Sequence, residues 1–345
     1  DSTSADDEVD FDRAEMLENY GNNIILPAFE EMQSSVNALQ ATAEDFENDR
    51  SSEQLEELQS ALKNTRLSWQ KINLFTFGPS GDVLLQASLN TYPSDTDEIE
   101  ENISSGDYSL GSIDNRDAAG LPALGYLLHG IGSDNEETLS AYTTDSDAEN
   151  RMAYLLDNIS FIKDLVDSAG SEWQASGGDY IGTFLSEERA GTDVGSSLGM
   201  LINSLDQHYE RYMRDGKIGI PAGVRSAGTP RPAAVEAYHG GYSLELAQAN
   251  LDQIEQVFTG GSGKGLDDNL EAHDAGELSE EIKAELDEAR AALNTLEDPL
   301  SDQIEENNEP VLTAFDELQD LVALLKADMT SVLGITITFQ DNDGD

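Results

Sequence analysis

The chain has 345 residues, too many for one ordinary hydrophobic core, so we expect two domains. It carries 70 acidic residues against 18 basic ones, a formal charge of −52, which argues against binding to nucleic acid or to anionic lipid surfaces. Because the chain contains no cysteine, disulfides and thiol chemistry are excluded.

The acidic residues are spread over nearly the whole chain, whereas a disordered acidic tail would concentrate them. A compact protein with this charge repels itself, and molar salt relieves the repulsion by shortening the Debye length to about 3 Å. The sequence therefore favours a halophilic source. The chain starts at Asp1 with a polar, acidic stretch, so we expect a processed or trimmed chain from which any signal or lipid-anchor segment has been removed.

Apolar residues that recur every three and four positions predict seven amphipathic helices. The first stripe runs from Leu17 to Leu39, and Pro27 inside it should kink the helix. The second stripe covers residues 55–72 and stops before Gly78 and Pro79. The remaining stripes cover residues 152–166, 198–212, 244–258, 282–296 and 311–329. We predict an all-α fold of two helical-bundle domains, with a short strand at residues 335–339 (ITITF) near the C-terminus.

Three segments interrupt the helical pattern. Residues 91–116 form a polar, acidic connection, and residues 129–147 have the glycine and acid content of a linker. We therefore expect an N-terminal bundle over residues 1–140 and a C-terminal bundle over residues 141–345. Residues 216–241 are rich in glycine and proline, and loops of this length in compact domains are usually functional or disordered.

Basic residues concentrate around the start of this last segment, from five positions before it. Five of the 18 lie between positions 211 and 231, where only Asp215 opposes them: Arg211, Arg214, Lys217, Arg225 and Arg231. Two interpretations remain open. The segment is held between the domains by ion pairs with neighbouring acids, or it meets an anionic partner.

Motif searches give little sign of catalysis. The zinc-protease pattern His-Glu-x-x-His is absent, and His208 lies on an apolar helix face, which favours a hydrogen-bonded core histidine over a ligand. Asp341, Asp343 and Asp345 place oxygen ligands at alternate positions, as at the start of a calcium loop. The acid that normally completes such a loop is missing, so these residues are a weak calcium site and a solvated tail is the alternative. The sequence leaves the identity of any other cofactor unknown.

Several segments together resemble the imelysin-like family of bacterial cell-envelope proteins, which includes the insulin-cleaving membrane protease and iron-regulated proteins linked to iron uptake. The similar segments occur in a consistent order over most of the chain: residues 69–79 (WQKINLFTFGP), 120–130 (GLPALGYLLHG), 217–223 (KIGIPAG), 235–246 (VEAYHGGYSLEL) and 324–345 (LLKADMTSVLGITITFQDNDGD). The resemblance implies two helical bundles with a functional site between them.

This chain departs from the family where the chemistry is expected. The family hallmark is Gly-x-His-x-x-Glu, whose histidine and glutamate are thought to bind metal, and the segment that starts at Gly120 has Pro122 and Gly125 in their places. Neither residue has a side chain that ligates metal or transfers a proton. Asn73 stands where relatives often have a further glutamate.

The sequence and the resemblance leave three candidate functions. The first is a non-enzymatic envelope protein in the periplasm or on the outer cell surface, anchored at most by a removed lipid segment. It would bind an unknown ligand or envelope partner between the bundles, within an iron or haem uptake system that the resemblance implies. The second is a metallopeptidase of the imelysin type, and the third is a structural interaction module. Residues expected to line the cleft are Trp69, Asn73, Phe77, Pro122, Gly125, Tyr126, Lys217, Arg225 and Arg231.

Overall fold

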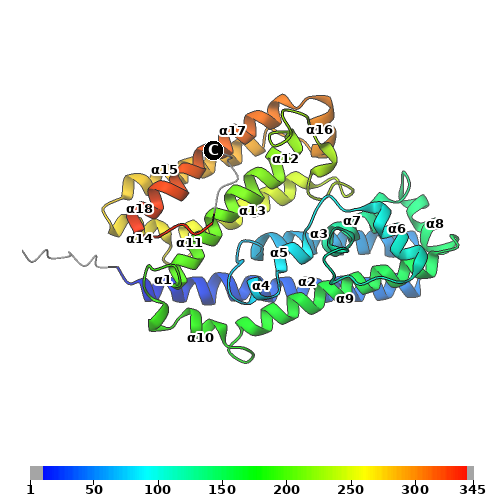
Figure 1. The fold of residues 1–345 in the computed structure, drawn as a ribbon, viewed down its shortest axis with the longest axis horizontal. Coiled ribbons are helices and arrows are strands. Elements are labelled where there is room, and N and C mark those ends of the chain that lie inside the picture. The colour runs from blue at the N-terminus through cyan, green and yellow to red at the C-terminus, as the bar shows by residue number, and fades with distance from the viewer. Residues whose placement is uncertain (1–10, 340–345) are drawn as a thin grey trace, which may run out of the picture.

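The computed structural model describes residues 11–339, and within them every regular element is a helix. Figure 1 shows two layers of helices that run along the long axis of the molecule. Helices α1–α10 form one layer, called here the first half, in which α2 and α9 lie side by side. Helices α11–α18 form the other layer, the second half, in which α15 packs against both α13 and α17.

The first half is built around three long helices. Helix α2 packs against α3 and α9, and the shorter helices surround them. Ser51 caps the start of α3 by accepting a hydrogen bond from the backbone of Gln54. The elements are α1 (Arg13–Asn19), η1 (Tyr20–Ile25), α2 (Leu26–Asn48), α3 (Ser52–Ile72), α4 (Pro79–Asp82), α5 (Leu85–Leu89), α6 (Thr96–Ser105), η2 (Arg116–Ala118), α7 (Gly120–Gly125), η3 (Tyr126–Gly130), α8 (Asn135–Thr143), α9 (Ala148–Trp173), α10 (Tyr180–Phe184) and η4 (Glu187–Arg189).

The second half contains a long π-helical segment, η5, that continues α11 without a break. Ser196 caps the start of α11 through a hydrogen bond from the backbone of Gly199, and Gly260 ends α13 with a positive φ of 69°. The elements are α11 (Ser197–Gln207), η5 (His208–Gly219), α12 (Ile220–Ala222), η6 (Pro232–Ala234), α13 (Ser243–Thr259), α14 (Leu266–Ala272), α15 (Gly276–Leu293), α16 (Leu300–Glu306), α17 (Glu309–Ala323), η7 (Leu324–Met329) and α18 (Thr330–Leu333).

The two halves share one hydrophobic core. A single cluster of buried side chains continues from α2, α3 and α9 into α11, α13, α15 and α17, and α3 packs directly on α13. The division into two domains therefore stays a prediction, as does the boundary at residue 140. Helix α9 begins after that boundary yet packs on α2, which favours placing any division after α10.

The seven predicted helices are all present. Each apolar stripe coincides with a helix or with a helix that a π-helical segment continues, as in α11 with η5 and α17 with η7. A π-helical segment, η1, ends two residues before Pro27, which occupies the first turn of α2, and the kink expected at Pro27 stays a prediction. The apolar stripes predict these helices correctly because each helix buries one face, and that face is made of apolar residues.

Two segments expected to be connections contain helices. Helix α6 lies within residues 91–116 and α8 lies within residues 129–147. Their apolar faces are short, but Asp95 and Asp134 each accept a backbone hydrogen bond three residues further on, as helix caps do. These capping residues, followed by acidic residues in the first turn, are the signal that the stripe search missed.

The predicted strand at residues 335–339 is wrong. These residues form no helix or strand, because no neighbouring strand is available in residues 11–339. The side chain of Asn203 takes that role: its Nδ2 donates to the carbonyl of Thr336 at 3.0 Å, and its Oδ1 accepts from the backbone N–H of Thr338 at 2.7 Å. An amide side chain thus satisfies the extended backbone in place of a sheet.

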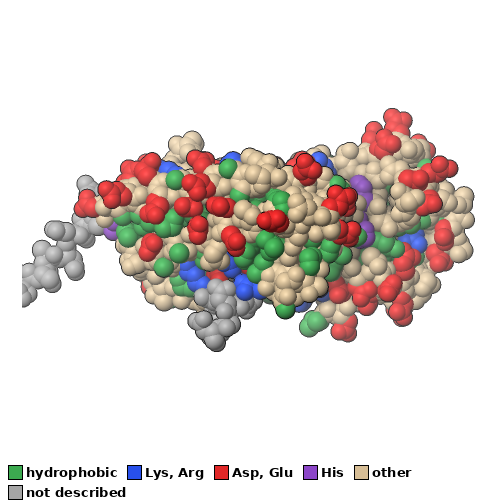
Figure 2. All heavy atoms as spheres, turned by 90° about the horizontal axis from the view of Figure 1, so that it is seen from above, with side chains coloured by type: hydrophobic (Ala, Val, Ile, Leu, Met, Phe, Trp, Pro, Cys, Tyr) green, Lys and Arg blue, Asp and Glu red, His purple; other side chains and the backbone are tan. Residues whose placement is uncertain are grey.

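The surface carries the excess charge that the sequence gives this chain. Figure 2, which views the molecule from above Figure 1, shows acidic side chains over the whole visible face and hydrophobic side chains gathered between them. Within the described residues, none of the helices combines the length and the apolar composition needed to cross a membrane.

Candidate functional site

A groove runs between the two halves and consists of three adjoining pockets. The tryptophan pocket, about 170 Å³, is lined by Trp69, Asn73 and Leu85, and the central pocket, about 440 Å³, by Asn90 and Arg231. The arginine pocket, about 200 Å³, is lined by residues that include Arg66, Pro122, Gly125, Val235 and His239. Neighbouring pockets share lining residues: Gln86, Ala87 and Tyr212 join the first two, and Tyr92 and Pro93 join the last two.

Both halves contribute one wall of the groove. The first half supplies residues 84–94, which include α5 and the turn after it, and the second half supplies η5 and the segment around η6. The segment η5 is π-helical, and π-helical segments are frequent at functional sites. Leu84 stands at the rim with 59% of its surface exposed and a positive φ of 49°, an unfavourable backbone conformation for leucine.

Several buried polar atoms without a hydrogen-bond partner belong to residues that line this groove. Within residues 11–339 they include atoms in all three pockets: Trp69 Nε1, Ser80 Oγ, Gln86 Oε1, Asn90 Oδ1, and Arg66 Nε and Nη1. Native proteins pair most such atoms, because an unpaired buried donor or acceptor costs free energy. Their alignment along one groove is typical of a surface that binds a polar ligand.

Arg66 dominates the arginine pocket. Its side chain is 2% exposed, its Nη2 donates to the carbonyl of Leu121 at 2.6 Å, and its guanidinium lies 5.9 Å from the ring centre of Tyr242. Within the described residues Arg66 makes no ion pair with a carboxylate. Gly125 makes room for it, since a β-carbon at residue 125 would stand 2.6 Å from Arg66 Nη2.

The histidines around this pocket are neutral at pH 7. Burial, followed by the charge of Arg66, lowers the pKa of His239 to about 4. The same two causes, with His239 as a third, lower the pKa of His129 to about 4. Burial, and after it the carboxylate of Glu236, raises the pKa of Tyr92 well above its usual value. Arg66 is therefore the cation of this pocket.

Behind the groove lies a buried polar network that joins the two halves. Lys217 pairs with Glu236, and both hydrogen-bond to Gln70 of α3, through Lys217 Nζ to Gln70 Oε1 at 2.8 Å and Gln70 Nε2 to Glu236 Oε1 at 3.0 Å. Asn90 Nδ2 donates to the same Glu236 oxygen at 2.9 Å. The network continues from Gln70 through Asn73 and Asn250 to His208.

The charges in this network compensate one another. Burial opposes ionisation of Glu236, but Lys217, Asn90 and Arg66 outweigh it and hold the pKa of Glu236 below its usual range. Burial lowers the pKa of Lys217, and Glu236 opposes that shift. His208 is the hydrogen-bonded core histidine that its helix face predicts, with Nε2 at 2.9 Å from Asn250 Oδ1.

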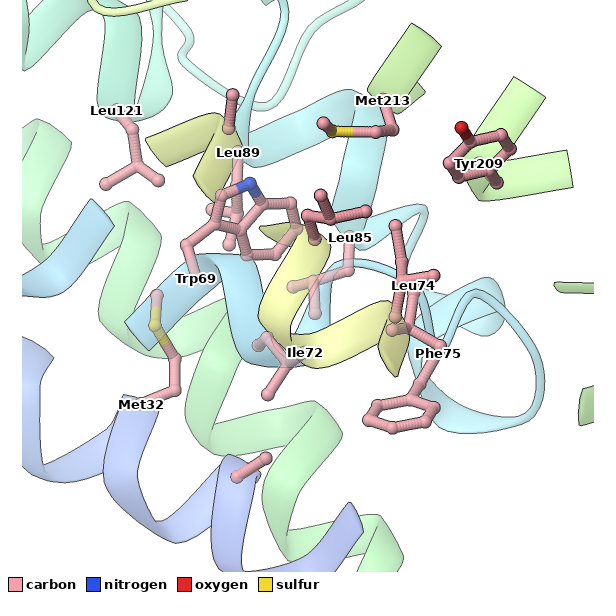
Figure 3. Packing of buried hydrophobic residues seen from close by; sticks show 14 of the residues in the cluster. Met32, Trp69, Ile72, Leu74, Phe75, Leu85, Leu89, Leu121, Tyr209 and Met213 are labelled. Carbon is pink, nitrogen blue, oxygen red and sulfur yellow. The ribbon is translucent and has the colours of Figure 1, made fainter. Parts of the chain in front are cut away.

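The predicted cleft residues fall into different surroundings. Trp69 and Asn73 line the tryptophan pocket, and Pro122 and Gly125 line the arginine pocket. Figure 3 shows that the indole of Trp69 also lies next to Leu85 and Leu89 of the first half, within the hydrophobic cluster that includes Met213 and Tyr209 of the second half. Trp69 is therefore both core and pocket wall.

Two predicted aromatic residues lie away from the arginine and central pockets. Phe77 stacks on Phe184 with ring centres 6.0 Å apart and meets Trp173 edge to face, in an aromatic group of the first half. Tyr126 donates its hydroxyl hydrogen bond to Glu100 at 2.7 Å, and its ring lies 5.3 Å from that of His239. Tyr126 thus supports His239 from outside the lining of the arginine pocket.

The predicted basic residues also separate. Lys217 is buried in the polar network, and Arg225 pairs with Asp215 at 2.7 Å. Arg231 lines the central pocket. Ion pairs therefore hold much of the basic segment in place, in line with the first of the two interpretations, while Arg231 faces the groove. Asp341, Asp343 and Asp345 of the weak calcium prediction lie outside the described residues.

Sequence reasoning missed Arg66, Gln70 and Glu236. A signal for Arg66 was present: it follows Leu62 by four positions and precedes Trp69 by three, so a charged residue sits on the apolar stripe of α3. Gln70 and Glu236 carry no comparable signal, because their partners lie far away in sequence.

The residues present do not fit a transition metal. Pro122 and Gly125 have no side-chain atoms that could ligate a metal, and the Arg66 guanidinium lies beside Gly125. Across residues 11–339, no three or more His, Cys, Asp or Glu side chains come together in a group that could hold a metal ion. A catalytic zinc normally takes three protein ligands.

The fold has known relatives. The family model described as Imelysin, of the peptidase M75 group, matches residues 25–327. Among solved structures, a protein described as an iron-regulated protein A precursor from Parabacteroides distasonis ATCC 8503 is 17% identical with a TM-score of 0.76, over 93% of this chain and 95% of that chain. An imelysin-like protein from Psychrobacter arcticum 273-4 is 18% identical with a TM-score of 0.73, over 96% and 99%. No curated protein matches the sequence.

Proposed function

Because the chain belongs to the imelysin family, we propose that it is a ligand-binding protein of the cell envelope that holds its ligand in the groove between the two halves. The observation that carries this proposal is the line of unpartnered buried polar atoms along all three pockets, within the described residues. A bound ligand would satisfy them.

The description of a structural neighbour supports the proposed envelope location and the proposed link to iron. One structural neighbour is described as a precursor of an iron-regulated protein, which supports export of this chain to the periplasm or outer surface and a function connected with iron. The acidic surface supports a protein that works at high salt.

A non-enzymatic role is favoured over a metallopeptidase. Peptide hydrolysis by a metal needs an activated water, a general base and metal ligands, and positions 122 and 125 supply none of them. The positive charge of Arg66 beside Gly125 would also repel a divalent cation.

Native mass spectrometry of the protein purified from its own cells tests ligand binding. We expect the wild-type protein to retain a small molecule, and we expect the substitution Gln86→Trp to abolish that retention, since Gln86 joins the tryptophan and central pockets. Ala175→Trp is the matched control, because Ala175 is exposed outside the groove. Identical spectra for all three proteins would contradict the proposal.

A further inference from the structure

The arginine pocket carries an uncompensated positive charge. Two buried cations, Arg66 and Lys217, stand near one buried carboxylate, Glu236, which is already paired with Lys217. Two further carboxylates close to this region already have a cation: Glu100 is paired with Arg151 at 2.7 Å and Glu245 with Lys63 at 2.5 Å. The nearby histidines are neutral, so they neither add to this charge nor cancel it.

Such a charge is costly to keep. Burying a guanidinium without a carboxylate partner forfeits its hydration, and Nε and Nη1 recover no hydrogen bond from the described residues. The chain nevertheless opens space for it at Gly125, where a larger residue would collide with Nη2. In a protein with a net charge of −52, this arrangement is the reverse of the general surface.

The remaining lining of the arginine pocket is mainly apolar. Pro93, Pro122, Ala233, Val235 and Ala237 surround the cavity, and its volume is about 200 Å³. This space suits a compact apolar body, and one cation suits one negative charge. Guanidinium groups bind carboxylates through planar, charge-assisted hydrogen bonds.

We propose that the arginine pocket binds the carboxylate of a small monoanionic organic acid, with Arg66 as the anion-binding residue and the apolar wall holding the rest of the molecule. Positions 122 and 125, at which the family has a histidine and a glutamate, would thus line an anion-binding pocket in this chain. The inference rests on the proposed function, because it assigns a ligand class to one end of the same groove.

Benzoate is a suitable probe because it combines one carboxylate with a compact apolar ring. Binding is measured by calorimetry and by thermal shift in 2 M sodium chloride, so that chloride competes equally in every sample. We expect benzoate to bind with a Kd of about 1 mM or tighter, and neutral benzamide to bind at least about tenfold more weakly. Equal affinity for the two compounds would overturn the proposal. Tighter binding of inorganic phosphate than of benzoate would overturn the assignment to a carboxylate.

Two variants locate the site. Arg66→Met removes the charge and should abolish benzoate binding while the free protein stays folded, because within the described residues no carboxylate loses its partner and the only hydrogen bond lost is the one to the carbonyl of Leu121. A lowered melting temperature with unchanged benzoate affinity would instead assign Arg66 a structural role. Ala233→Phe fills the cavity from an exposed position and should also abolish binding, whereas the remote Ala175→Phe should not.

The experiments distinguish a failure of the proposed ligand-binding function from a failure of the proposed carboxylate site. If a native ligand is retained and then lost in Gln86→Trp, but benzoate binds no better than benzamide, the groove still binds a ligand and the anion assignment is wrong.

Discussion

Replacing Lys217 with methionine is expected to lower the free energy of unfolding by about 3–5 kcal/mol. Lys217 is 3% exposed and pairs with Glu236, which is 1% exposed. Removal of the ammonium group leaves a buried carboxylate without its counter-charge, and it also removes the hydrogen bond to Gln70 that links the two halves. Chemical denaturation at fixed salt measures the loss.

Two controls make this result specific. Lys71 pairs with Glu31 at 2.7 Å, but their side chains are 43% and 48% exposed, so Lys71→Met should cost about 0–1 kcal/mol. The double variant Lys217→Met with Glu236→Gln removes both buried charges and keeps an amide beside Gln70 and Asn90. We expect it to recover most of the loss. A single-variant loss as small as that of Lys71→Met would show that the polar network does not hold the halves together.

Replacing Trp69 with alanine is expected to cost about 3–5 kcal/mol. The indole is 1% exposed and lies in the hydrophobic cluster that both halves share, part of which Figure 3 shows, so its removal leaves a cavity in that core. Leu84→Ala is the control on the rim of the same pocket, where an exposed side chain should contribute within about 0.5 kcal/mol. A loss of less than about 1 kcal/mol for Trp69→Ala would mean that the indole is pocket wall and not core.

The helical architecture could be predicted from the sequence because it depends on local periodicity. A helix that buries one face has apolar residues at every third and fourth position, and each of the seven stripes of this kind lies in a helical segment of the structure. The short helices α6 and α8 were not predicted because a helix of few turns has too few apolar residues to form a clear stripe. Their capping residues, Asp95 and Asp134, were the stronger signal. The prediction of a strand at residues 335–339 was wrong because a strand needs a neighbouring strand to pair with, and its own residues do not show whether one is present.

The site was harder to predict than the fold. Positions 122 and 125 were found through the family resemblance, and both line the arginine pocket. The positive charge of this pocket was not predicted, because Arg66 lies on a different helix from Pro122 and Gly125 and comes close to them only in the folded chain. Glu236 and Gln70 meet across 166 positions of sequence, a pairing that no local pattern encodes.

The most direct test of the central claim is anomalous X-ray scattering from crystals soaked with zinc and with 4-bromobenzoate, recorded at the absorption edges of zinc and bromine. The groove is predicted to show a bromine peak in the cavity lined by Arg66, and no zinc peak beside Pro122 and Gly125. A zinc ion seated beside those two residues, with no bromine next to the guanidinium, would contradict the account.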